Sequence, residues 1–130
     1  MRWITDDTTT FCTRLAKRGE RFDGIILDPP AFGRGGPKRR EWRIERDLPE
    51  LTDVLSTLLS EDPAFVLLSA HDELWGAERL AGSVAQMLPY GAEQRGAMER
   101  GAMLLSAATP EGVDLPMGSY ARWAAGPVAG

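Results

Sequence analysis

The stretch that decides the fold is residues 22–32, which read Phe-Asp-Gly-Ile-Ile-Leu-Asp-Pro-Pro-Ala-Phe. Its apolar centre, residues 25–27, is typical of a strand buried on both faces, as in the middle of a parallel sheet. Pro29 and Pro30 end that strand because they lack an N–H donor and favour an extended turn. Asp28 is therefore predicted at the carboxyl end of a central strand, which is where open α/β sheets bind their ligands.

Outward from this stretch, the hydrophobic pattern alternates between strands and helices. In chain order it predicts a strand tail at 3–5, a helix at about 8–17, the strand at 24–27, a basic loop from 29 to about 46, a helix that begins at Asp47, a strand at 64–69, a helix at about 74–88, and two late strands near 102–107 and 118–123. This order is that of an α/β fold with a mostly parallel sheet. The two late strands would form an antiparallel hairpin at one edge.

Length and composition exclude several classes of protein. A chain of 130 residues forms at most one domain. The net charge of -4 indicates no global affinity for nucleic acid, so such binding must come from a local patch. No apolar run approaches the roughly 20 residues that span a membrane, and no set of residues has metal-ligand spacing. With a single cysteine and no signal-peptide pattern after Met1, we expect a cytoplasmic protein.

Residues 28–32, Asp-Pro-Pro-Ala-Phe, resemble the catalytic-loop motif of class I S-adenosylmethionine-dependent methyltransferases. They are most similar to the large-subunit ribosomal RNA methyltransferases that act on cytosine or guanine. The resemblance continues at residues 2–7, 65–69 and 115–118, in the order and spacing of that family. It implies a Rossmann-like methyltransferase sheet and S-adenosylmethionine as cofactor. Residues 1–130 would be the carboxyl-terminal part of one catalytic domain, with the amino-terminal half missing.

The resemblance also implies roles for the loop. Asp28, Pro29, Pro30 and Phe32 would line the pocket between the cofactor methyl group and a target base, with Asp28 near the cofactor as well. An acidic side chain and turn carbonyls can accept hydrogen bonds from a base amino group. Phe32 can stack on a base that has been flipped out or is already unpaired.

Asp7 and Thr8 resemble the family's adenine site. A carboxylate there would accept from the exocyclic amine of adenine, and the next backbone N–H would meet a ring nitrogen. The alternative is that Asp6 or Asp7 caps the helix that follows. The two roles are compatible with each other.

Two further features could bind a substrate. The basic residues of the loop after the motif are predicted to contact RNA phosphates, although a solvated loop would look the same; they are Arg34, Lys38, Arg39 and Arg40. His71, the only histidine, follows the strand at 64–69 and should emerge at the same sheet edge as Asp28. It could accept a proton or contact the base, or be a structural residue.

The enzymes that methylate cytosine C5 use a cysteine after this second strand, where Ser69-Ala70-His71 has none. Cys12 lies in a predicted helix and is expected in the core. Direct transfer to a base nitrogen therefore fits better. The alternatives are a non-catalytic methyltransferase half that binds RNA or a partner, and a methyltransferase for a small molecule or protein.

No Gly-rich turn for the cofactor follows an early strand, and Gly33-Arg34-Gly35-Gly36 lacks phosphate-loop spacing. We therefore expect this chain alone to bind cofactor poorly, and we expect its partners to be RNA and a missing amino-terminal half or a complementing chain.

Overall fold

The computed structural model describes residues 1–33 and 41–126. Its helices and strands follow one another in this order: α1 (Thr8–Lys17), β1 (Gly24–Leu27), β2 (Phe32–Gly33), β3 (Trp42–Arg43), α2 (Ile44–Leu58), β4 (Phe65–Ala70), α3 (Ala77–Met87), the 3-10 turn η1 (Glu93–Arg95), β5 (Gly96–Leu105) and β6 (Leu115–Ala125). Within these residues, no helix has the length and apolar character needed to cross a membrane.

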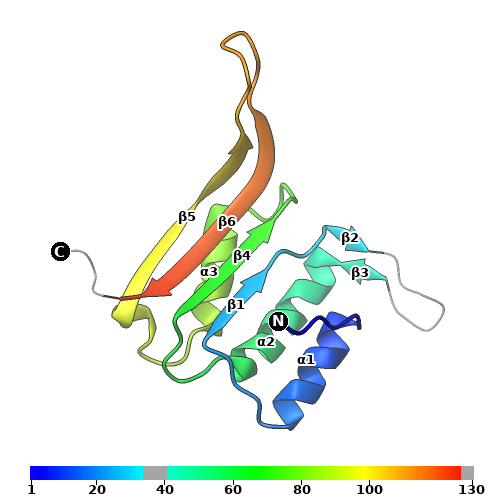
Figure 1. Ribbon diagram of the computed structural model, residues 1–130, viewed down its shortest axis with the longest axis vertical. Coiled ribbons are helices and arrows are strands. Elements are labelled where there is room, and N and C mark those ends of the chain that lie inside the picture. The colour runs from blue at the N-terminus through cyan, green and yellow to red at the C-terminus, as the bar shows by residue number, and fades with distance from the viewer. Residues whose placement is uncertain (34–40, 127–130) are drawn as a thin grey trace.

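The main sheet has the strand order β1-β4-β6-β5 (Figure 1). β1 pairs parallel with β4, and β6 pairs antiparallel with both β4 and β5. Three strands of this sheet therefore run in one direction and β6 runs against them. The predicted mixed α/β fold with an antiparallel edge hairpin is confirmed, although β5 begins at Gly96, earlier than the sequence indicated.

One face of the sheet carries the core. Val66, Leu68 and Ala70 alternate along β4 and are fully buried, and their neighbours on β6 include Ala121 and Trp123, which are buried too. Figure 1 shows α3 behind β4 and β6, with α2 beside it and α1 outermost. Val84 and Leu80 of α3 and Leu48, Leu51 and Leu55 of α2 complete this packing. Every second residue of the strands is therefore buried against the apolar stripes of the helices.

The opposite face of the sheet, here called the open face, corrects one prediction. Residues 25–27 were expected to be buried on both sides, but Ile26 is 68% exposed and Phe65 is 37% exposed. β1 is an edge strand, and its register places Ile26 beside Leu67 on the face away from the helices. Ile25 and Leu27, on the helix face, pack against the core.

Two further predictions are corrected near the helices. Residues 3–5 form no strand, and Trp3 is 86% exposed, because no strand in the described part of the chain lies alongside to pair with it. α2 begins at Ile44 rather than at Asp47, so Pro49 lies inside the helix. Helix α1, in contrast, has the predicted bounds: Asp7 accepts from the Thr10 N–H, and Gly19, at φ +75°, follows its end.

Candidate functional site

The candidate site is built on the carboxyl ends of β1 and β4. Leu27 lies beside Leu68 in the parallel register, so the next residue on each strand, Asp28 and Ser69, also come together. The Ser69 hydroxyl donates to Oδ1 of Asp28 at 2.6 Å. His71 Nε2 lies 3.3 Å from the same oxygen, which confirms that the histidine and Asp28 share one sheet edge.

This polar cluster, Asp28 with Ser69 and His71, lies on the open face because its strand positions alternate with the buried Leu68 and Ala70. Both contacts go to Oδ1, and no group in residues 1–33 or 41–126 bonds Oδ2 of Asp28. One oxygen is thus fixed by the protein and the other can accept from a ligand. Ser69 bonds the carboxylate rather than the imidazole, so the cluster is not arranged as a hydrolytic triad.

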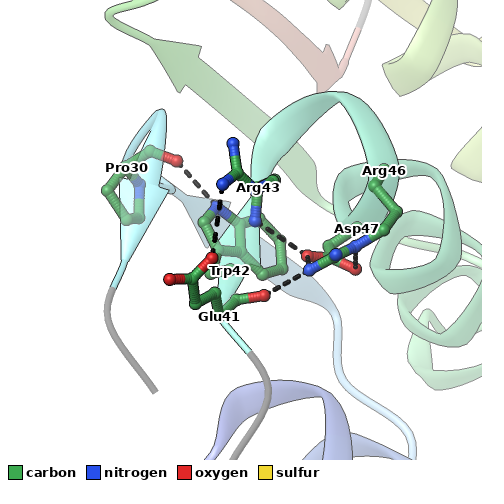
Figure 2. A network of polar contacts seen from close by, with 6 residues as sticks. All are labelled: Pro30, Glu41, Trp42, Arg43, Arg46 and Asp47. Atoms are coloured by element: carbon green, nitrogen blue, oxygen red, sulfur yellow. Dashed lines mark hydrogen bonds and ion pairs between the residues drawn. The ribbon is translucent and has the colours of Figure 1, made fainter.

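The Asp-Pro-Pro turn is held by a side chain of β3. The indole Nε1–H of Trp42 donates to the Pro30 carbonyl at 2.7 Å (Figure 2). Pro29 is buried and Pro30 is exposed. Of the two turn carbonyls expected to meet a base, that of Pro30 therefore already has one lone pair bonded within the protein.

Phe32, which was predicted to stack on a base, lies on β2. It is 48% exposed, and in the β2–β3 pair it lies directly opposite Arg43. The Arg43 guanidinium lies over the ring at 5.5 Å from its centroid, within the range of a cation–π contact. Arg43 also reaches the Glu41 carboxylate at 3.3 Å.

The buried carboxylate of Asp47 anchors the β2–β3 pair to α2. Asp47 is 5% exposed; it accepts from the backbone N–H of Arg43 at 2.8 Å and from Nε and Nη2 of Arg46 at 3.0 and 2.9 Å (Figure 2). Arg46 donates as well to the Glu41 carbonyl. Its hydrogen bond to Asp47 raises the pKa of the Arg46 guanidinium. Asp47 therefore fixes the junction between β3 and α2 instead of capping a helix that begins at Asp47.

A second ion pair joins the first turns of α2 and α3. Arg79 Nη1 and Nη2 donate to the two Glu45 oxygens at 2.8 and 3.0 Å. The guanidinium also lies 3.7 Å from the Trp75 ring centroid. The hydrogen bonds from Arg79 hold the pKa of Glu45 below its ordinary value. The pair ties together two helices that begin at the site's edge of the sheet.

The start of α1 carries Asp7 and Thr8, the residues predicted to meet adenine. Asp7 Oδ2 accepts from the Thr10 N–H at 2.9 Å, so the predicted capping role is observed. Thr8 is the first helical residue, and its N–H has no carbonyl one turn earlier to bond. Arg14 forms an ion pair with Asp6. A carboxylate followed by a backbone donor can match the amine and ring nitrogen of adenine.

All four residues predicted to contact phosphates lie outside the described residues: Arg34, Lys38, Arg39 and Arg40. In the part of the chain that the structure describes, no group of three or more His, Cys, Asp or Glu side chains could hold a metal ion. Cys12 is buried in the core, and burial raises the pKa of its thiol. Sequence reasoning missed the roles of Ser69 and Asp47, whose partners depend on strand register and on the true start of α2.

No protein-family model matches the chain, and no curated protein matches it. Its fold matches the SAM-dependent methyltransferase from Agrobacterium tumefaciens, with a TM-score of 0.77 and 25% identity over 95% of this chain. It also matches SMU.776, a candidate methyltransferase complexed with SAH, with a TM-score of 0.57 and 13% identity over 91% of this chain.

The chain spans 39% of the length of the first of these structures and 30% of the second. The chain is thus similar in fold to part of a SAM-dependent methyltransferase, as the resemblance of residues 28–32 implied. Neither likeness distinguishes an RNA substrate, so the acceptor, the phosphate-contacting loop and the individual site residues stay predictions.

Proposed function

We propose that this chain is the catalytic-loop part of an S-adenosylmethionine-dependent methyltransferase that methylates an amino nitrogen of an RNA base by direct transfer. The observation that carries the proposal is Asp28, with one oxygen held by Ser69 and His71 and the other available to a ligand N–H. S-adenosylmethionine, when bound, supplies an electrophilic methyl group. Asp7 and Thr8 would hold its adenine, and the task of the remaining site residues is to position the base.

A nucleobase suits the side chains around Asp28. Phe32 exposes an aromatic ring next to the acidic turn, and Arg43 lies over that ring. A base stacked on Phe32 would present its edge toward Asp28, whose carboxylate can only accept hydrogen bonds and so selects an amino group. The absence of a cysteine at Ser69-Ala70-His71 leaves no nucleophile for the covalent route to carbon.

Asp28→Ala tests the site. The full-length native protein is incubated with methyl-labelled S-adenosylmethionine and total RNA from cells that lack it. We expect labelling to fall at least about 100-fold, as when an oriented polar group is removed from an active site. Asp23→Ala is the matched control, since Asp23 accepts from Ser60 at 2.7 Å in the same way at the opposite end of β1. Equal labelling by the two variants would refute the assignment of Asp28.

Removing positive charges from the loop after the Asp-Pro-Pro turn tests whether the substrate is RNA. Replacing Lys38, Arg39 and Arg40 with Gln should weaken RNA methylation and flatten its salt dependence, by about 0.7 in log–log slope per lost phosphate contact. The matched control removes the same number of positive charges at the end of α1 and just after it, at Lys17, Arg18 and Arg21. An effect no larger than the control's would favour a small molecule or a protein as the methyl acceptor.

We further propose that the working enzyme contains polypeptide that covers the open face, in the same chain or in a complementing one. Support comes from the exposed Ile26 and from the 39% span of the Agrobacterium methyltransferase. Residues 1–130 alone should then bind S-adenosylmethionine poorly, and tight binding in calorimetry would contradict this. Ile26→Glu should leave residues 1–130 folded yet disrupt the complete enzyme. Val113→Glu, at an 82% exposed position of the β5–β6 loop, should leave both residues 1–130 and the complete enzyme intact.

A further inference from the structure

The β2–β3 pair has two faces that differ in exposure. Gly33 lies opposite Trp42 on one face and Phe32 lies opposite Arg43 on the other, because neighbouring residues of a strand point to opposite sides. Trp42 packs against the core and bonds the Pro30 carbonyl. Phe32 is 48% exposed, and the Arg43 side chain is 60% exposed. Phe32 and Arg43 therefore share the outer face of the pair.

Arg43 has a fixed backbone and a weakly held guanidinium. Its N–H is bonded to Asp47 at 2.8 Å, and the residue is the N-cap of α2 (Figure 2). The guanidinium contacts the Phe32 ring and donates one long hydrogen bond, of 3.3 Å, to the Glu41 carboxylate. Glu41 is half-exposed as well, and exposed ion pairs contribute little free energy. A ligand can therefore displace the guanidinium without moving β3.

The space between the guanidinium and the ring is close to what a nucleobase needs. The guanidinium carbon lies 5.5 Å from the Phe32 ring centroid. Stacked bases are about 3.4 Å apart, so a base between two planar groups needs about 7 Å between them. Rotation of bonds in the exposed Arg43 side chain can supply the missing distance of about 1.5 Å. Aromatic rings and Arg guanidinium planes are the surfaces on which unpaired RNA bases stack.

We propose that Phe32 and Arg43 form a clamp, in which the target base lies between the aromatic ring and the guanidinium. The clamp rests on the proposed function, to which it adds Arg43 as a binding residue and the face of the ring that the base uses. Before RNA binds, the guanidinium covers that face. Every base offers a π face, so the clamp holds all bases alike and the choice among them is left to Asp28 at the base edge.

The clamp can be measured without methyl transfer. The probe is a single-stranded oligouridylate with one 2-aminopurine, whose fluorescence falls when the base stacks, and it is added to the full-length native protein with S-adenosylhomocysteine. Arg43→Lys keeps the charge but loses the plane, and we expect about 10-fold weaker binding and weaker quenching at saturation. Arg18→Lys, at the end of α1, is the matched control and should bind like the unmodified protein. Unchanged binding and quenching by Arg43→Lys would overturn the clamp.

Stability and kinetics separate binding from a structural role. Arg43→Lys keeps the backbone bond to Asp47, so its midpoint of urea unfolding should not change. In the methylation assay its KM for RNA should rise about 10-fold with kcat little changed. A normal KM, or a lowered urea midpoint that accounts for the loss, would refute Arg43 as a binding residue.

The two sides of the clamp should act as a unit. Phe32→Ala removes the other surface, so the double variant with Arg43→Lys should bind the probe little worse than Phe32→Ala alone. Fully additive losses would contradict a joint clamp. If the unmodified enzyme labels RNA without quenching the probe, only the clamp is refuted. If it neither labels RNA nor quenches the probe, the proposed function itself is refuted.

Discussion

Replacing Asp47 with alanine is expected to lower the free energy of unfolding by about 2 kcal/mol. The Arg43 N–H would lose the side chain that caps it at 2.8 Å, and a lost cap costs about 1 kcal/mol. The two bonds from Arg46 would go as well. The Arg46 side chain is 43% exposed, so that pair contributes at most about 1 kcal/mol. Because Asp47 is buried, water does not simply replace its carboxylate as the partner of the Arg43 N–H.

The assay is urea unfolding followed by tryptophan fluorescence, with the slope of free energy against urea checked for constancy. Arg46→Ala is the matched control and should cost less than about 1 kcal/mol, since only the exposed part of the network is lost. Asp47→Asn keeps an oxygen for the Arg43 N–H and should lie between the two. If Asp47→Ala proves no more destabilising than Arg46→Ala, the anchoring of β3 to α2 by this carboxylate is refuted.

Three further predictions concern other parts of the fold. Gly118→Ala should destabilise by more than about 2 kcal/mol in urea, and Gly19→Ala by only about 1 kcal/mol, because both have positive φ but only the first meets backbone atoms; equal losses would contradict the close approach. Arg79 lowers the Glu45 pKa, so Glu45→Gln should cost stability at pH 7 and progressively less as the pH falls below about 4; a loss independent of pH would refute the coupling. Burial raises the Cys12 pKa, so at pH 8 iodoacetamide should alkylate it far more slowly in the folded than in the urea-unfolded chain, with equal rates as the contrary result.

The elements that the sequence predicted well are those with local signals. Helix α1 has a capping aspartate before it and a glycine of positive φ after it, and its bounds are as predicted. The start of α2 was misplaced because Arg43 at the cap has no capping side chain, and the carboxylate that bonds its N–H lies four residues further on. A cap made by a residue inside the helix cannot be distinguished in sequence from one made at its start.

Of the candidate site, the sequence could predict only which residues follow the ends of the parallel strands. Parallel strands bring their carboxyl ends to one edge, which is why His71 could be expected near Asp28. That Ser69 bonds Asp28 depends on the register of β1 against β4, and a shift of one residue would have turned it to the other face. The bond from Trp42 to Pro30 depends on how β2 and β3 fold back, for which the sequence holds no periodic signal.

The open face and the polar cluster have one surface in common. Asp28 directly follows β1, two residues after Ile26, and Leu67 and Ser69 are two residues apart on β4, so the apolar patch leads directly into the site. The Asp28 side chain is 57% exposed here, and water weakens its contacts. Polypeptide that covered Ile26 and Leu67 would also exclude water beside Asp28, and both the hydrogen bond from Ser69 and the orientation of His71 would strengthen in the lower dielectric. Covering of the open face and activation of the site are therefore expected to occur together, and a substitution on the open face should reduce kcat even though it touches no reacting group.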